Sequence, residues 1–81
     1  MHEFINDPIA VTVEFDGPRV KPTSIFWNNR HYPIPHVNLV HSAREGQKRL
    51  FYFSVSDSTN FMKLRFDTET LNWHITEFYA E

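Results

Sequence analysis

Short runs of β-branched and aromatic residues, separated by turn residues, fill most of the 81-residue chain. Such runs are typical of strands, and no stretch of a dozen residues has the apolar spacing of a helix. In the first run apolar residues alternate with alanine, threonine and acidic residues, which is the pattern of a strand with one face in water. The pattern predicts seven strands, at residues 9–15, 23–27, 30–34, 37–42, 49–56, 61–66 and 73–79.

The strongest local signal is a tight turn at Asn28 and Asn29, which lie between two aromatic-rich runs. A two-residue type I′ hairpin needs a positive φ at both central residues, and asparagine accepts this conformation better than most residues. The resulting register places Trp27 opposite Arg30. We expect the Arg30 side chain to reach the rim of the core or to stack on Trp27.

The turns between the runs are short, and short connections favour an antiparallel meander of neighbouring strands. Residues 49–56 are apolar on both faces, as expected for a central strand. Thirteen aromatic residues are too many for a flat sheet with one wet face. We therefore expect a small all-β fold, either a strongly curved antiparallel meander or an SH3-like partly open barrel of about six to seven short strands. The expected core residues are Trp27, Tyr32, Leu39, Phe53, Leu64, Phe66, Trp73 and Ile75.

The length fits a single β domain over residues 1–81, with residues 1–7 weakly ordered. The chain has no cysteine, so it has neither a disulfide nor a cysteine-ligated zinc. Its first eight residues lack the charge and the apolar segment of a signal peptide, and no apolar run approaches the ~20 residues that span a bilayer. We expect a cytoplasmic protein with no membrane contact.

Residues suited to catalysis are present but not in a catalytic pattern. Serines at 54, 56 and 58 are not surrounded by a nucleophile-elbow motif, and Asp57 and Asp67 fall in turns, where aspartate commonly shapes the backbone. We therefore expect no enzyme activity, no catalytic residues and no cofactor.

Three histidines, His31, His36 and His41, recur every five residues. A zinc site needs three or four ligands that converge on the ion. On an extended strand a spacing of five puts neighbouring side chains on opposite faces, although bends at Pro33 and Pro35 could change this. We expect no metal site.

A nucleic-acid surface is the leading functional expectation, because small β barrels bind single strands by stacking bases on aromatics flanked by lysine and arginine. Residues 49–56 and 61–66 should pair across the intervening turn, which predicts a binding face of Arg49, Phe61, Lys63 and Arg65. The competing interpretation is a solvated strand face whose charges prevent aggregation. The net charge of −2 argues against a general polyanion binder.

An interaction module is the alternative function. The edge near Val20–Pro22, or the carboxy-terminal Phe78 and Tyr79, could accept a partner strand or sit in an interface. Exposed Phe61 and Tyr79 would then form an apolar patch. The partner would then be another protein or a second copy, and the chain a monomer or weak homodimer. Salt separates the two hypotheses, because only nucleic-acid affinity falls steeply as salt rises.

A series of short motifs lies in the segment from Pro22 to Phe78, which covers about two-thirds of the chain. In order they are Pro22, Phe26-Trp27, Arg30-His31-Tyr32, Val37 to Val40, Phe51 to Val55, Leu64 to Asp67 and Leu71 to Ile75. This series resembles DUF6504, a bacterial family of domains of unknown function. Asn28 stands where that family usually has glycine, and His41 or Ser42 stands where it often has tryptophan. Similar segments form the tail of bacterial proteins related to Y-family DNA polymerases, so the resemblance implies a role with a partner or a nucleic acid, and it offers no catalytic residues. We therefore expect a non-catalytic accessory or adaptor domain.

Overall fold

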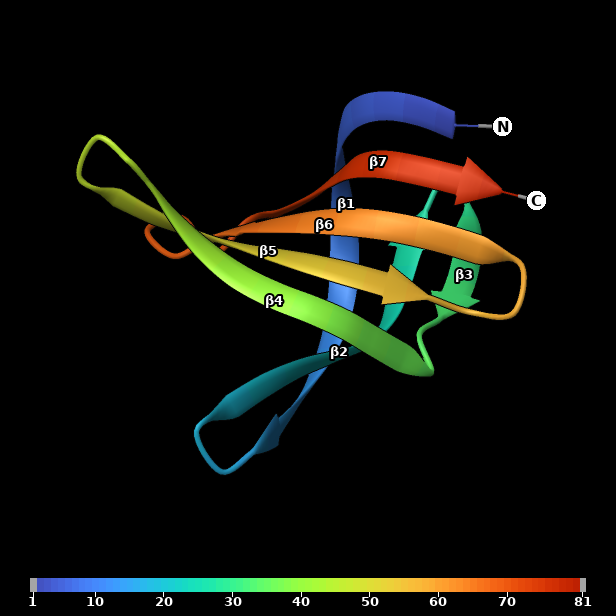
Figure 1. Ribbon diagram of the computed structural model, residues 1–81, viewed down its shortest axis with the longest axis horizontal. Coiled ribbons are helices and arrows are strands. Elements are labelled where there is room, and N and C mark those ends of the chain that lie inside the picture. The colour runs from blue at the N-terminus through green and yellow to red at the C-terminus, as the bar shows by residue number, and fades with distance from the viewer. Residues whose placement is uncertain (1, 81) are drawn as a thin grey trace.

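The computed structural model describes residues 2–80, and within that range it contains seven strands and no helix (Figure 1). All seven predicted strands are present, and neighbouring strands in the sheet are antiparallel. The fold is therefore a small all-β meander, as the sequence predicted. The strands are β1 (His2–Asp16), β2 (Arg19–Trp27), β3 (Arg30–Pro33), β4 (His36–Glu45), β5 (Lys48–Ser56), β6 (Asn60–Asp67) and β7 (Trp73–Ala80).

The strands form one sheet in the order β3-β2-β1-β7-β6-β5-β4, so the first and the last strand of the seven lie side by side in the interior of the sheet. The first half of β1, residues 2–9, pairs with β7, and the second half, residues 10–16, pairs with β2. Residues 2–7 thus belong to a paired strand, contrary to the expectation of weak order for residues 1–7; Met1 lies outside the described residues. Ile5 packs against the core and anchors this segment despite the polar residues that follow it.

The sheet curves into a partly open barrel. Strands β3 and β4 are the two ends of the sheet, yet only Ile34 and Pro35 separate them in the chain. Figure 1 shows the consequence: the two end strands meet at this corner, while the β1–β2 and β4–β5 hairpins diverge on the other side. The Ile34 amide donates a hydrogen bond to the Thr23 carbonyl at 2.8 Å, which extends the pairing of β3 with β2 up to the corner.

The core occupies one face of the curved sheet, which we call the inner face. It comprises Ile25, Tyr32, Ile34, Phe53, Val55, Met62, Leu64 and Ile75, with Trp27, Phe66 and Trp73 among the half-buried residues packed against it. Seven of the eight expected core residues are therefore in or against the core. Cross-strand pairs such as Phe53–Leu64 and Leu64–Ile75 align these side chains in rows across the sheet.

Leu39 is the one expected core residue that was wrong, because 58% of it is exposed. Simple alternation from the half-buried Val37 would turn Leu39 toward the core. A β-bulge between these two residues inserts Asn38 without a partner, so that Leu39 pairs with Ser54 and Val40 pairs with Phe53. The extra residue inverts the alternation, and Val40 takes the inner face instead.

The predicted hairpin is confirmed in conformation and register. Asn28 and Asn29 have φ values of 54° and 66°, and Trp27 pairs with Arg30. The Arg30 guanidinium lies over the ring of Tyr32, 5.6 Å from its centroid, rather than on Trp27.

The turn between β5 and β6 is organised by one carboxylate. Asp57 Oδ1 accepts hydrogen bonds from the amides of Thr59 at 2.8 Å and Asn60 at 2.7 Å, and its Oδ2 accepts one from Asn60 Nδ2 at 3.1 Å. Burial raises the pKa of Asp57, but these hydrogen bonds outweigh burial and hold the pKa below its ordinary value. The ionised carboxylate therefore stabilises the fold.

Replacing Asp57 with alanine is expected to lower the free energy of unfolding by about 1–3 kcal/mol at neutral pH, because two backbone amides lose their acceptor. A lowered native pKa means that the contribution is present above the ordinary aspartate value, near ~3.9, and is lost as pH falls through the native pKa. Urea denaturation of wild type and variant at pH 7 and below pH 3 should show the difference shrinking in acid. Asp57→Asn, which keeps one acceptor oxygen, should lose less, and a larger loss in Asp57→Asn would contradict this account.

Candidate functional site: the outer face and the groove at the open edge

The four residues predicted for nucleic-acid binding lie on two faces of the sheet. Lys63 and Arg65 share the face opposite the core, which we call the outer face, with Phe61. Arg49 does not join them. Arg65 pairs with Tyr52 across β5 and β6, so the odd-numbered residues of β5 face the core side. The expectation that Arg49 shares a face with the other three was wrong.

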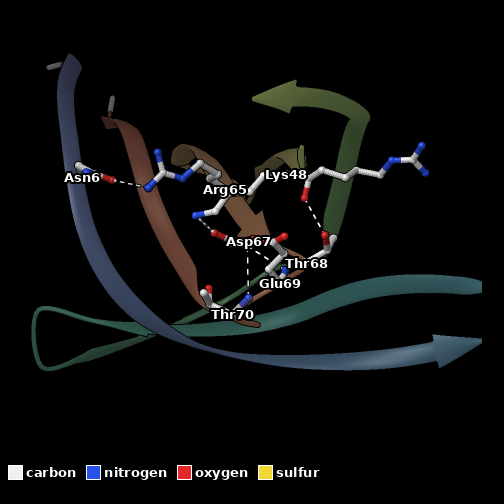
Figure 2. A network of polar contacts seen from close by, with 8 residues as sticks. Asn6, Lys48, Arg65, Asp67, Thr68, Glu69 and Thr70 are labelled. Carbon is white, nitrogen blue, oxygen red and sulfur yellow. Dashed lines mark hydrogen bonds and ion pairs between the residues drawn. The ribbon is translucent and has the colours of Figure 1, made fainter. Parts of the chain in front are cut away.

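Lys63 and Arg65 already have polar partners. Lys63 Nζ lies 3.2 Å from Glu77 Oε2, and His2 Nε2 lies 3.0 Å from Glu77 Oε1. Burial raises the pKa of Glu77, but the hydrogen bonds from His2 and Lys63 outweigh burial and lower the pKa overall. Arg65 Nη2 donates to Asn6 Oδ1 at 3.1 Å, across to β1 (Figure 2). The ion pair with Glu77 offsets the charge of Lys63 and so leaves less positive charge for a polyanion.

A second polar network, also in Figure 2, fixes the turn after β6. Lys48 Nζ donates to Asp67 Oδ2 at 3.0 Å, and Asp67 Oδ1 accepts the amides of Glu69 and Thr70. The hydrogen bond from Lys48 and those two amides lower the pKa of Asp67, while Asp67 raises the pKa of Lys48. The Thr68 hydroxyl donates to the Arg49 carbonyl at 2.8 Å, which ties the turn to the start of β5.

The outer face also carries an aromatic pair that sequence reasoning missed. The rings of His41 and Tyr52 stack at 5.1 Å with an interplanar angle of 14°, and Tyr52 pairs directly with Arg65. The signal was present in the sequence: a register set by the turn at residues 57–60 already places Tyr52 opposite Arg65.

Phe61 and Tyr79 are cross-strand neighbours on the outer face, and both are partly exposed, as expected for an apolar patch. His2 and Phe4 extend this patch, with ring centroids 4.7 Å apart. The expectation that Phe78 and Tyr79 could accept a partner strand was wrong, because β7 is paired on both sides, with β1 and β6.

The three regularly spaced histidines lie on the two end strands. His31 on β3 contacts the ring of Phe26 at 4.8 Å, and His41 on β4 stacks on Tyr52, while His36 begins β4. Residues 2–80 contain no group of three or more histidine, aspartate or glutamate side chains that could hold a metal ion. The same range contains no helix that is long and apolar enough to cross a membrane.

A groove of about 870 Å³ lies on the open side of the barrel. It lies between the start of β2, around Val20, and β4. Phe51, Phe53 and Phe66 line it from the inner face, and Val37 and Val40 line it from β4. This volume is within the range of ~300–1,000 Å³ that is usual for ligand pockets.

Unpaired strand edges border this groove on both sides. Among residues 2–80, β4 ends the sheet and pairs only with β5, and β3 covers β2 only from Ser24 to Trp27. In the described range, residues 19–22 of β2 therefore pair only with β1. Every second residue of an unpaired edge points its N–H and C=O away from the sheet, where another strand can bind them. The predicted edge near Val20–Pro22 is present, and the longer edge of β4 was not anticipated.

No protein-family model matches this chain, and comparison with curated proteins and with solved structures likewise found no match.

Proposed function

We propose that this chain is a non-catalytic accessory module that binds a partner protein at the open side of its barrel. The observation that supports this most directly is the groove between the unpaired edges of β2 and β4. Addition of a partner strand to a sheet edge uses backbone hydrogen bonds for affinity and neighbouring pockets for specificity. We place the module in the bacterial cytoplasm, in keeping with the resemblance to DUF6504 and with a chain that has no cysteine.

Exposed apolar side chains at the groove support the same proposal. Val40 lines the groove and is 46% exposed, and Leu39 beside it is 58% exposed. Aliphatic side chains on a free edge strand are an aggregation hazard that proteins usually cover or replace with charge. A partner strand over β4 would bury both residues.

Selection from a phage-displayed library of random dodecapeptides tests this function. Enriched peptides should bind the wild type and the variant Phe4→Glu, since Phe4 is 78% exposed on the outer face and outside the groove. They should not bind Val40→Glu, which places the same charge in the groove wall. Absence of enrichment, or equal loss of binding in the two variants, would refute the proposal.

A second candidate function is single-stranded nucleic-acid binding on the outer face. Its support is the stacked pair of His41 and Tyr52 beside Arg65, with Phe61 and Lys63 on the same face. Amide NMR spectra recorded with a mixed oligonucleotide, first at low and then at near-physiological salt, test it. Shifts confined to these residues that vanish with salt would favour this function, and an unmoved spectrum would eliminate it.

A further inference from the structure

We infer that the occupant of the groove is an acidic peptide segment of another protein, bound in extended conformation along β4, with alternate apolar side chains directed at the groove and carboxylates at Arg44 and Arg49. This inference rests on the proposed function and specifies the chemistry of its partner. Three features of the described residues support it: a pair of facing arginines, an apolar lining and a free strand edge.

Arg44 and Arg49 are direct cross-strand partners at the outer end of the β4–β5 hairpin. Counting from Val40 and Phe53, which face inward, the register puts both arginines on the inner face, the same side as the groove lining. Like charges directly opposite each other on a sheet are destabilising. A carboxylate between the two guanidinium groups would relieve this repulsion and form charge-assisted hydrogen bonds.

The charges that line the groove itself have the same bias. Arg19 and Lys21 line it, and Asp16 is the single acidic residue among the lining side chains of the described chain. A basic peptide would meet repulsion at both ends of the groove, whereas an acidic peptide would meet attraction. Charge complementarity of this kind governs specificity and association rate more than it governs affinity.

The apolar lining and the free edge together require an extended occupant. After the bulge at Asn38, β4 pairs with β5 without interruption from Leu39 to Glu45, so its other edge offers an unbroken run of seven residues. A strand laid along this run turns every second side chain toward Phe51 and Phe66. A helix or a proline-rich segment would leave the β4 amides without partners.

Three capped octapeptides provide the probes: alternating valine and glutamate, alternating valine and lysine, and the valine–glutamate peptide with one central proline. Calorimetric titration should show binding of the first, and about tenfold weaker binding of the second, because charge-assisted hydrogen bonds are lost. The third should bind weakly as well, since proline removes a backbone donor and disfavours a central ladder.

Variants locate the contacts. Arg49→Gln and Arg44→Gln should each weaken the valine–glutamate peptide about tenfold, whereas Phe4→Glu should leave its affinity unchanged. The unfolding midpoint of Arg49→Gln should be unchanged or raised, because a repulsive pair is removed. Loss of binding without loss of stability is a result that a purely structural arginine would not give.

Hydrogen exchange reports the backbone pairing itself. Bound peptide should slow exchange of alternate β4 amides between Leu39 and Glu45, which contact by side chains alone would not do. Equal affinity for the acidic and basic peptides, or no added protection in β4, would overturn the inference. Protection that rises with protein concentration in the absence of peptide would assign the edge to a second copy instead.

The phage-displayed dodecapeptide library separates this inference from the proposed function. If the library yields ligands that are neither acidic nor extended, this inference fails while the proposed function stands. If the library yields no ligands, both fail.

Discussion

Replacing Leu64 with alanine should lower the free energy of unfolding by about 3–4 kcal/mol, as measured by urea denaturation. Leu64 is 0% exposed and lies between Phe53 on β5 and Ile75 on β7. Its removal leaves a cavity that strands held on both sides cannot collapse to fill. A domain of this length has only about 4–12 kcal/mol of stability in total, so the variant should be close to unfolding at 37 °C.

Leu39→Ala is the matched control, because it deletes the same atoms at a position that is 58% exposed. We expect it to cost less than about 0.5 kcal/mol. The comparison also tests the bulge at Asn38, which turns Leu39 away from the core. Equal losses in the two variants would show that the register of β4 is wrong.

Replacing Trp73 with alanine should cost about 3 kcal/mol, the lower end of the ~3–5 kcal/mol expected when a large aromatic is removed from a core. The indole stacks on Phe66 with centroids 4.6 Å apart and lies 5.2 Å from the ring of Phe53. It is half-buried, and for that reason we expect the lower value. Thermal and urea unfolding measure the loss.

Trp73→Phe should recover much of that stability, since a smaller ring keeps part of the stacking. Phe61→Ala, on the outer face, provides the exposed aromatic control and should cost far less. A Trp73→Ala protein with an unchanged melting point would refute the assignment of this residue to the core. Because Phe53 and Phe66 also line the groove, peptide binding should weaken together with the core.

Local patterns predicted most of the fold. Alternation and turn residues identified all seven strands, and the two asparagines fixed the register of one hairpin because only a few residues accept a positive φ. The features that the sequence did not reveal depend on contacts between segments that are distant in the chain. The pairing of β1 with β7 joins segments from opposite ends of the described chain, and the bulge at Asn38 inverts an alternation that otherwise reads as regular.

The candidate site was less predictable, for a related reason. Lys63 and Arg65 share a face by simple alternation, whereas the face of Arg49 follows from the register between β5 and β6. That register could have been derived from the turn at residues 57–60. The groove could not, because it depends on where the ends of the sheet fail to meet, and this is decided by strand length and twist rather than by any one motif.

The pairing of β1 with β7 inside the sheet sets an order of assembly during synthesis. Its first half pairs with β7, the last strand of the seven to leave the ribosome, while β4 to β7 form a run of neighbouring hairpins that can close locally. Joining segments so distant in the chain carries a larger loop-closure cost, so we expect β1 to dock after the hairpins. A nascent chain paused before β7 would hold residues 2–9 as an unpaired edge, exposed to neighbouring chains on the same message.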